Sequence, residues 1–331
     1  MRAWCLLSSL SMALVGGHAT AADSPASEGL ITYCSGPFAY LISPDGTNKV
    51  QLAHARMALQ DVALAPDGVT MAWVRGTAFI SHVYVQVDAA TTMAVDVIRG
   101  RNQRVGCLGF RPDSSALLYS GGGRVVLVDL PSCRTRVVAR GDRGQWVAGG
   151  PQFIYETGAR EEDEEIGLHL ASVEGGPDEL VVPYGCQAVV SADGARIAYR
   201  MPFASDDPRV YIMELASRQS REMDQSTRFD RPLAFSPDGG LLLVDRADLS
   251  GDALCFQLCV LDVATGGIAR LHSGSTETYE AAFSPGGQRV CFAATVDGRR
   301  MLHTVSVDGQ GLSIVAPDDG DVRSPHWRQG R

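Results

Sequence analysis

The chain has 331 residues, its formal net charge at pH 7 is −9, and 45% of its residues are hydrophobic. The negative charge argues against nucleic acid and against an anionic membrane surface as binding partners. No apolar run reaches the roughly 20 residues that a membrane-spanning helix requires, so membrane insertion is not expected.

The N-terminal segment MRAWCLLSSLSMALVGGHATAA is a predicted signal peptide. It carries Arg2, then an apolar run to Val15, and it ends with small residues. This pattern is typical of a secretory signal, here cleaved after Ala21. The predicted organisation is a signal peptide at 1–21, a linker at 22–29 and a folded domain at 30–331. The product is expected to be periplasmic or secreted.

A turn motif recurs along the rest of the chain. Near-copies are ALAPDGVT (63–70), GFRPDSSA (109–116), VVSADGAR (189–196), LAFSPDGG (233–240) and AAFSPGGQ (281–288). Apolar strand formers lie on both sides of each motif, which predicts a hairpin between two strands, A and B. Pro presets a turn, Asp accepts bonds from following amides, and Gly adopts positive φ without strain. The repeated carboxylates are therefore predicted to brace turns and not to act in catalysis: Asp45, Asp67, Asp113, Asp193 and Asp238.

A second hairpin, of strands C and D, can be aligned without gaps in seven places. Its copies are AYLISPDGT, VYVQVDAAT, VVLVDLPSC, LHLASVEGG, VYIMELASR, LCVLDVATG and LHTVSVDGQ. Two of the His residues, His169 and His303, share one position of this repeat with Tyr40, Tyr84 and Tyr211, so packing explains them.

The A strands predict how the ring closes. Six are expected near Ala63, Leu108, Val147, Ala188, Leu233 and Ala281, and the first C–D hairpin has no A strand before it. The terminal segment Ser324–Trp327 supplies a seventh, so the C-terminal strand should pair with the N-terminal blade and remove exposed sheet edges. About 44 residues per unit fit a four-stranded propeller blade. The predicted fold is all-β, a single propeller of seven four-stranded antiparallel blades, with six blades as the alternative.

The SPDG turn, followed by a hairpin that starts with Tyr and an apolar residue, resembles the TolB-like β-propeller repeats. The resemblance covers nearly the whole chain beyond the signal, and it is specific for the repeat rather than for one member. Such repeats occur in cell-envelope scaffolds, in lyases and in the gating domains of peptidases, so the resemblance implies a propeller without choosing among these functions.

The sequence contains no motif for a catalytic, metal or cofactor site. It has no G-x-S-x-G nucleophile elbow, no dinucleotide fingerprint and no phosphate loop. Eight cysteines include Cys5 in the signal, and the remaining seven lack the CxxC and CxxH spacings of zinc sites. Cys255 and Cys259 are too far apart along a regular strand to form a disulfide. No cofactor, metal or catalytic residue is therefore predicted.

The loops between strands D and A and between B and C should share one face, and they are irregular in sequence. Function is usually carried by variable loops on a rigid scaffold. The candidate partner-binding residues lie just before A strands or, for His326, within the closing segment: Asp61, Arg104, Asp230, Arg231, Glu280 and His326.

Two functions remain open from the sequence. The first is an exported, non-enzymatic scaffold that binds a protein or peptide on its loop-bearing face. The alternative is a lyase that acts on an acidic saccharide, which needs a metal held by several His or carboxylate groups and basic groups for the uronate. A third possibility is a sensor domain of a larger system. The sequence does not predict the oligomeric state.

The exported protein is expected to begin at Ala22, because the charged, apolar and small-residue parts of the signal agree. Intact-mass measurement of the exported form tests this prediction. A mass that includes residues 1–21 would contradict it.

Overall fold

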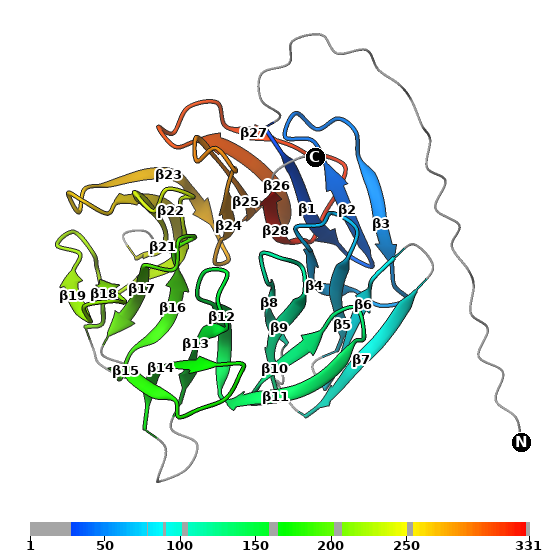
Figure 1. Ribbon diagram of the computed structural model, residues 1–331. Coiled ribbons are helices and arrows are strands. Elements are labelled where there is room, and N and C mark those ends of the chain that lie inside the picture. The colour runs from blue at the N-terminus through cyan, green and yellow to red at the C-terminus, as the bar shows by residue number, and fades with distance from the viewer. Residues whose placement is uncertain are drawn as a thin grey trace, which may run out of the picture.

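The computed structural model describes residues 28–77, 79–88, 91–100, 105–158, 165–201, 207–249 and 254–328. The predicted signal peptide and most of the predicted linker lie outside these ranges. The described residues form seven four-stranded antiparallel sheets arranged as the blades of a ring (Figure 1). The seven-bladed propeller is therefore confirmed, and the six-bladed alternative is wrong.

Each blade has an inner strand at the centre of the ring. The inner strands of blades 1 to 7 are β28 (Val322–Arg328), β4 (Leu59–Leu64), β8 (Gly106–Phe110), β12 (Asp142–Trp146), β16 (Cys186–Val190), β20 (Asp230–Phe235) and β24 (Glu280–Phe283). The second strands, in the same order, are β1 (Leu30–Ser35), β5 (Met71–Gly76), β9 (Ala116–Gly121), β13 (Gln152–Thr157), β17 (Arg196–Met201), β21 (Leu241–Asp248) and β25 (Arg289–Val296).

Two further strands complete each blade toward the outside. The third strands are β2 (Phe38–Ile42), β6 (Ile80–Gln86), β10 (Arg124–Asp129), β14 (Gly167–Ser172), β18 (Arg209–Glu214), β22 (Cys255–Asp262) and β26 (Arg299–Ser306). The outer strands are β3 (Val50–His54), β7 (Thr92–Arg99), β11 (Arg134–Arg140), β15 (Glu179–Pro183), β19 (Gln219–Glu222), β23 (Ile268–Ser275) and β27 (Ser313–Ile314).

The inner strands start earlier than the sequence predicts. For example, β4 begins at Leu59 and not near Ala63, and Val147 follows the end of β12. The apolar residues before each turn motif mark only the last part of the strand. The earlier part of the strand lacks a regular apolar pattern in the sequence, because bulges there interrupt the alternation of buried and exposed side chains.

The hydrophobic core lies between the blades. Seven clusters of buried apolar side chains occur in the described residues, and each joins two neighbouring blades. Leu242 of blade 6, for instance, shares a cluster with Ala198 of blade 5. A blade therefore buries both of its faces only when it has a neighbour on each side.

The repeated turn motifs brace the hairpins as predicted. In the turn of blade 6, the Asp238 carboxylate accepts hydrogen bonds from the Ser236 hydroxyl at 2.6 Å and from the Gly240 amide at 3.0 Å. These bonds lower the pKa of Asp238, the hydroxyl bond contributing most. Gly239 has a φ of 69°, which glycine adopts without strain. The carboxylate is thus occupied within its own turn.

The ring closes by pairing the two ends of the described chain. The strand β28 pairs antiparallel with β1, with Ile31 opposite Trp327. Trp327 is 8% exposed, and its indole nitrogen donates a 2.6 Å hydrogen bond to the Glu28 carbonyl. Arg328 reaches the Ala65 carbonyl of blade 2 at 2.9 Å. The predicted closure is confirmed.

The two faces of the ring differ in regularity. The A–B turns of blades 2 to 7 contain five or six residues, and they share a face with the C–D turns; we call this the turn face. The D–A and B–C connections form the opposite face, the loop face, and the B–C connections alone range from two residues (36–37) to nine (158–166).

No helix in the described part of the chain has the length and apolar character needed to cross a membrane. Cys255 and Cys259 both lie on β22, and both are free thiols, as are the other cysteines whose side chains are described.

Removing the closing strand is expected to destabilise the propeller. A Trp327→Ala variant should lose about 3 to 5 kcal/mol of unfolding free energy, the usual cost of truncating a buried aromatic side chain. Deletion of 324–331 should cost more, because it also exposes the edge of β1. Guanidinium unfolding measures both.

The matched control is His326→Ala, on the same strand but with an exposed side chain, which should change stability by no more than about 0.5 kcal/mol. Equal stability of the truncated and full-length proteins would refute the importance of closure.

Candidate functional site

The sequence-predicted site residues lie within the inner strands. The structure places these on β4, β20, β24 and β28: Asp61, Asp230, Arg231, Glu280 and His326. For the first four, the expectation that they precede the strands is wrong, because the strands begin earlier than their apolar parts. Arg104 lies outside the described residues.

Bulges near the start of the inner strands set the direction of side chains around the channel. The pairing of β12 with β13 shifts in register between Asp142 and Gln145. Similar register shifts occur where β4, β8, β16, β20 and β28 pair with the second strands of their blades. Arg143, Gln187 and Ser324, in three of these bulges, have φ of 55°, 54° and 48°. Left-handed conformations of this kind cost about 1 to 3 kcal/mol and cluster at functional sites. Bulges also redirect side chains locally.

Asp61, Glu280 and His326 meet through Ser324. The Ser324 hydroxyl donates a 2.6 Å hydrogen bond to Asp61 Oδ1, and its backbone amide donates to Glu280 Oε2. His326 Nε2 lies 3.7 Å from the same Asp61 oxygen. Blades 1, 2 and 7 thus contribute a connected, mainly acidic group to the channel mouth.

The thiol of Cys34 lies close to this acidic group. Cys34 is fully buried on β1. Burial raises the pKa of its thiol well above the ordinary value, and the negative charges of Asp61 and Glu280 raise it further. Because the thiolate is the nucleophilic form of cysteine, Cys34 is a packing residue and not a nucleophile.

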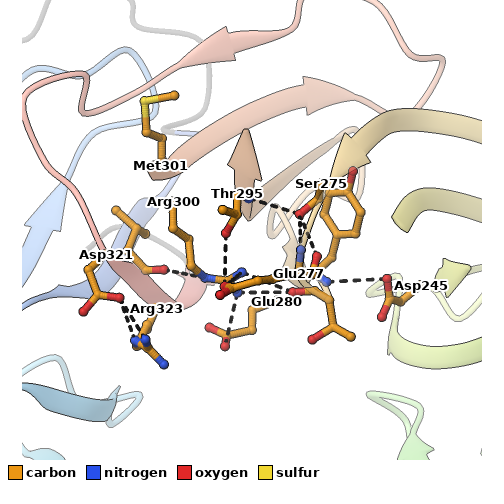
Figure 2. A network of polar contacts seen from close by, with 12 residues as sticks. Asp245, Ser275, Glu277, Glu280, Thr295, Arg300, Met301, Asp321 and Arg323 are labelled. Atoms are coloured by element: carbon orange, nitrogen blue, oxygen red, sulfur yellow. Dashed lines mark hydrogen bonds and ion pairs between the residues drawn. The ribbon is translucent and has the colours of Figure 1, made fainter. Parts of the chain in front are cut away.

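Arg300 organises the polar contacts beside Glu280. Figure 2 shows its guanidinium between Glu277, Glu280 and the segment that leads to Arg323. It contacts Glu277 at 3.1 Å and Glu280 at 3.3 Å, and its Nε donates to the Val322 carbonyl at 2.9 Å. Arg300 therefore fixes the first residue of the closing strand to blade 7.

Asp230 is buried and does not reach the channel surface. It has no exposed surface, and both carboxylate oxygens accept 2.7 Å hydrogen bonds from Arg246 on the neighbouring strand. Thr227 donates to the same carboxylate through its amide and its hydroxyl. Asp230, which the sequence suggested as a partner-binding residue, therefore has no surface with which to contact a partner. Its carboxylate has two strong partners within blade 6 and braces the loop before β20.

Arg231 forms an ion pair with the buried carboxylate of Asp245. Its Nη2 donates to Asp245 Oδ2 at 2.8 Å and lies 3.3 Å from the Tyr279 carbonyl oxygen. Burial raises the pKa of Asp245, and the positive charge of Arg231 opposes that rise. The pair fixes the position of the guanidinium.

A cavity of about 470 Å³ occupies the channel, a volume within the usual range of ligand sites. Arg231 and His326 line it, together with Arg143 and Gln145 of β12. Its apolar wall includes Trp146 and Leu233. The structure thus brings Arg231 and His326 together, and it adds a side chain, Arg143, that the loop sequences do not indicate.

A sequence signal for Arg143 exists in the repeat. Arg143 is the third residue before the last residue of β12, Trp146. The same count from the ends of β4 and β24 gives Asp61 and Glu280. Alignment by the last residue of these three strands selects Arg143, but it requires the end of β12, which the sequence did not predict because the segment GDRGQW lacks the Pro-Asp-Gly turn.

Metal-ligand geometry is absent from the described residues, since no group of three or more His, Cys, Asp or Glu side chains there could hold a metal ion.

No model of a known protein family matches the chain. The Tol-Pal system protein TolB of Nitrosospira multiformis is 36% identical over 78 residues, which are 24% of this chain and 17% of that protein. The TolB of Hydrogenovibrio crunogenus is 31% identical over 103 residues, which are 30% of this chain and 22% of that protein. The chain thus matches only about a fifth of the length of these curated relatives.

Solved structures match over a larger part of the chain. TolB from Acinetobacter baumannii has a TM-score of 0.62 at 18% identity, with 92% of this chain and 67% of that chain covered. An oligogalacturonate lyase in complex with manganese has a TM-score of 0.58 at 13% identity, with 87% and 84% covered. The tricorn protease has a TM-score of 0.63 at 12% identity, with 94% and 37% covered. These likenesses show the fold, and the chain resembles the TolB-like propeller repeat rather than TolB as a whole.

Proposed function

We propose that this chain is an exported β-propeller that binds a protein or peptide partner in the cell envelope through its loop face. The predicted signal peptide supports the location. The partial similarity to TolB, a protein of the Tol-Pal system, supports a role in the envelope.

The observation that carries the proposal is the position of the exposed aromatic side chains. Among the described residues, the exposed large aromatic side chains are Phe79, Tyr184 and Phe229, at 58%, 57% and 37% exposure, and all three belong to loop-face connections. Aromatic residues are enriched at protein interfaces, where they supply large contact areas. The turn face exposes smaller aliphatic groups such as Val50 and Val69.

Blade 6 concentrates this apolar surface. Phe229 precedes β20, and Leu249 and Leu254 lie in the connection between β21 and β22. The Ala247 amide donates a 3.4 Å hydrogen bond to the Phe229 carbonyl, so the two connections are adjacent. An apolar anchor on a rigid blade is suited to a partner with a complementary apolar pocket.

The polar candidates contribute to different degrees. His326 and Glu280 reach the surface of the mouth, and Arg231 reaches the channel cavity. Asp61 is oriented by Ser324, and Asp230 is buried against Arg246 and offers no surface to a partner. The proposed contact surface therefore consists of the loop-face apolar groups around a charged mouth.

The test is capture of envelope proteins by the purified mature chain, compared between two triple variants. Tyr184→Ser, Phe229→Ser and Leu249→Ser on the loop face should together reduce capture of the wild-type partner at least tenfold. Because these side chains are exposed, the melting temperature should remain close to that of the wild type.

The matched control changes Val50, Val69 and Leu312, also exposed but on the turn face, to Ser. It should capture the partner as the wild type does. Equal capture by both variants, or loss of capture only in the control, would overturn the proposal.

The lyase remains the alternative function, and one observation favours it: the basic groups Arg143, Arg231 and His326 in the channel cavity suit an acidic saccharide. Elimination from a polyuronate creates a carbon–carbon double bond conjugated to a carboxylate, which absorbs ultraviolet light. Incubation with polygalacturonate and Mn²⁺ should give no such absorbance if the chain is a binding protein, and a steady increase if it is a lyase.

A further inference from the structure

The charge of the channel cavity is opposite to that of the protein. The chain has a formal net charge of −9. Yet the charged side chains that line the cavity are Arg143 and Arg231, with His326 beside them, and no lining residue is acidic. A basic, concave site in an acidic protein attracts anionic groups selectively, because the low-dielectric walls focus its field.

The carboxylates that pair with these arginines are more deeply buried than the arginines and do not line the cavity. The side chains of Glu156 and Asp245 are 18% and 3% exposed, whereas those of Arg143 and Arg231 are 43% and 27% exposed. Neither carboxylate lines the cavity. Each ion pair therefore orients its guanidinium and presents more of the cation than of the anion to a ligand.

Both guanidinium groups retain donors for a ligand. Arg143 contacts Glu156 through Nε at 2.9 Å, and no hydrogen bond from either of its Nη atoms occurs within the described part of the chain. Arg231 uses Nη2 for Asp245 and Tyr279, and its Nη1 makes no hydrogen bond within the described part of the chain, while its Nε is buried and out of reach of a ligand. Each of the two arginines therefore has an Nη group whose hydrogens are available to a ligand in the cavity.

Arg218 on the turn face shows what a purely structural arginine looks like in this protein. Its φ is 58°, close to the 55° of Arg143, and it also pairs with a glutamate. However, its Nε and Nη2 both donate to Glu179, at 3.0 and 2.7 Å, and its Nη1 donates to the Leu215 carbonyl. At Arg218 all three guanidinium nitrogens therefore donate to protein acceptors, whereas the Nη atoms of Arg143 do not.

Apart from the two arginines, Gln145 and His326, the side chains that line the cavity are apolar. Trp146, Leu233 and Val189 face the same space as the arginines. An acidic saccharide makes apolar contacts only through the C–H faces of its rings, which suit Trp146 better than the aliphatic part of the wall. A peptide with aliphatic side chains on both sides of a carboxylate satisfies the apolar and the basic surfaces together.

We propose that the channel cavity binds a carboxylate of an acidic and otherwise apolar peptide segment, with Arg143 and Arg231 as the groups that bind the carboxylate. This proposal rests on the proposed function, because it names the chemistry of the segment that the partner inserts. The carboxylate belongs either to a side chain or to a chain terminus, since both present the same group to the arginines.

The test uses the full mature chain and synthetic peptides in a calorimetric titration. The first probe is Leu-Glu-Leu-Glu-Leu with both ends blocked, and its neutral counterpart has Gln in place of Glu. The acidic peptide should bind at least tenfold more tightly, and its affinity should fall as salt increases. The Gln peptide with a free carboxyl terminus shows whether a terminal carboxylate suffices.

Substitutions assign the binding to the cavity. Arg143→Asn should weaken binding of the acidic peptide at least tenfold, and Asn tolerates the left-handed backbone at this position. Arg143→Lys keeps the charge but loses the forked donors, and it should give an intermediate loss. The matched control, Arg218→Asn, should bind the peptide as the wild type does.

Three results would overturn the proposal: equal affinity for the acidic and neutral peptides, equal affinity of the Arg143→Asn and Arg218→Asn variants, or binding of trigalacturonate but of neither peptide. The comparison of two peptides on the wild-type protein needs no variant to fold. If Arg143→Asn captures the envelope partner normally while the loop-face triple variant does not, this proposal fails and the proposed function stands. If neither variant loses the partner, both fail.

Discussion

The structure depends on the burial of each blade between two neighbours. All seven apolar clusters lie at blade junctions, so the core is a ring of interfaces and not a single central core. The junction of blades 7 and 1 brings together Leu302 and Trp327, and it forms only when β28 has paired with β1. The closing strand therefore contributes hydrogen bonds to one blade and apolar surface to a junction between two.

The same closure builds part of the candidate site. Ser324 and His326 belong to β28, and through Ser324 they meet Asp61 of blade 2 and Glu280 of blade 7. Arg300 binds the carbonyl of Val322, at the start of that strand. Because Ser324 and His326 lie on the closing strand, the geometry of the mouth is available only in the closed ring, and it depends on the same strand pairing as the stability of the fold.

The periodic parts of the structure could be predicted from the sequence. Turn chemistry and strand patterning are local, so seven hairpins and the missing first strand were sufficient for the ring. The starts of the inner strands could not be predicted, because a bulge such as that around Arg143 leaves no local signature in the sequence. The burial of Asp230 depends on Arg246, which lies opposite it on β21, and that pairing is known only once the register is known.

The distribution of charge at the centre of the ring distinguishes structural from binding groups. The Asp230 carboxylate accepts hydrogen bonds from Arg246 at both oxygens, is fully buried and leaves no surface for a ligand. Arg143 and Arg231 are anchored by carboxylates that lie behind them, yet they retain donors that face the cavity. Anchoring a guanidinium before the ligand arrives reduces the entropy lost on binding. The buried carboxylates are thus consistent with an anion site, because they hold the arginines in place without themselves lining the cavity.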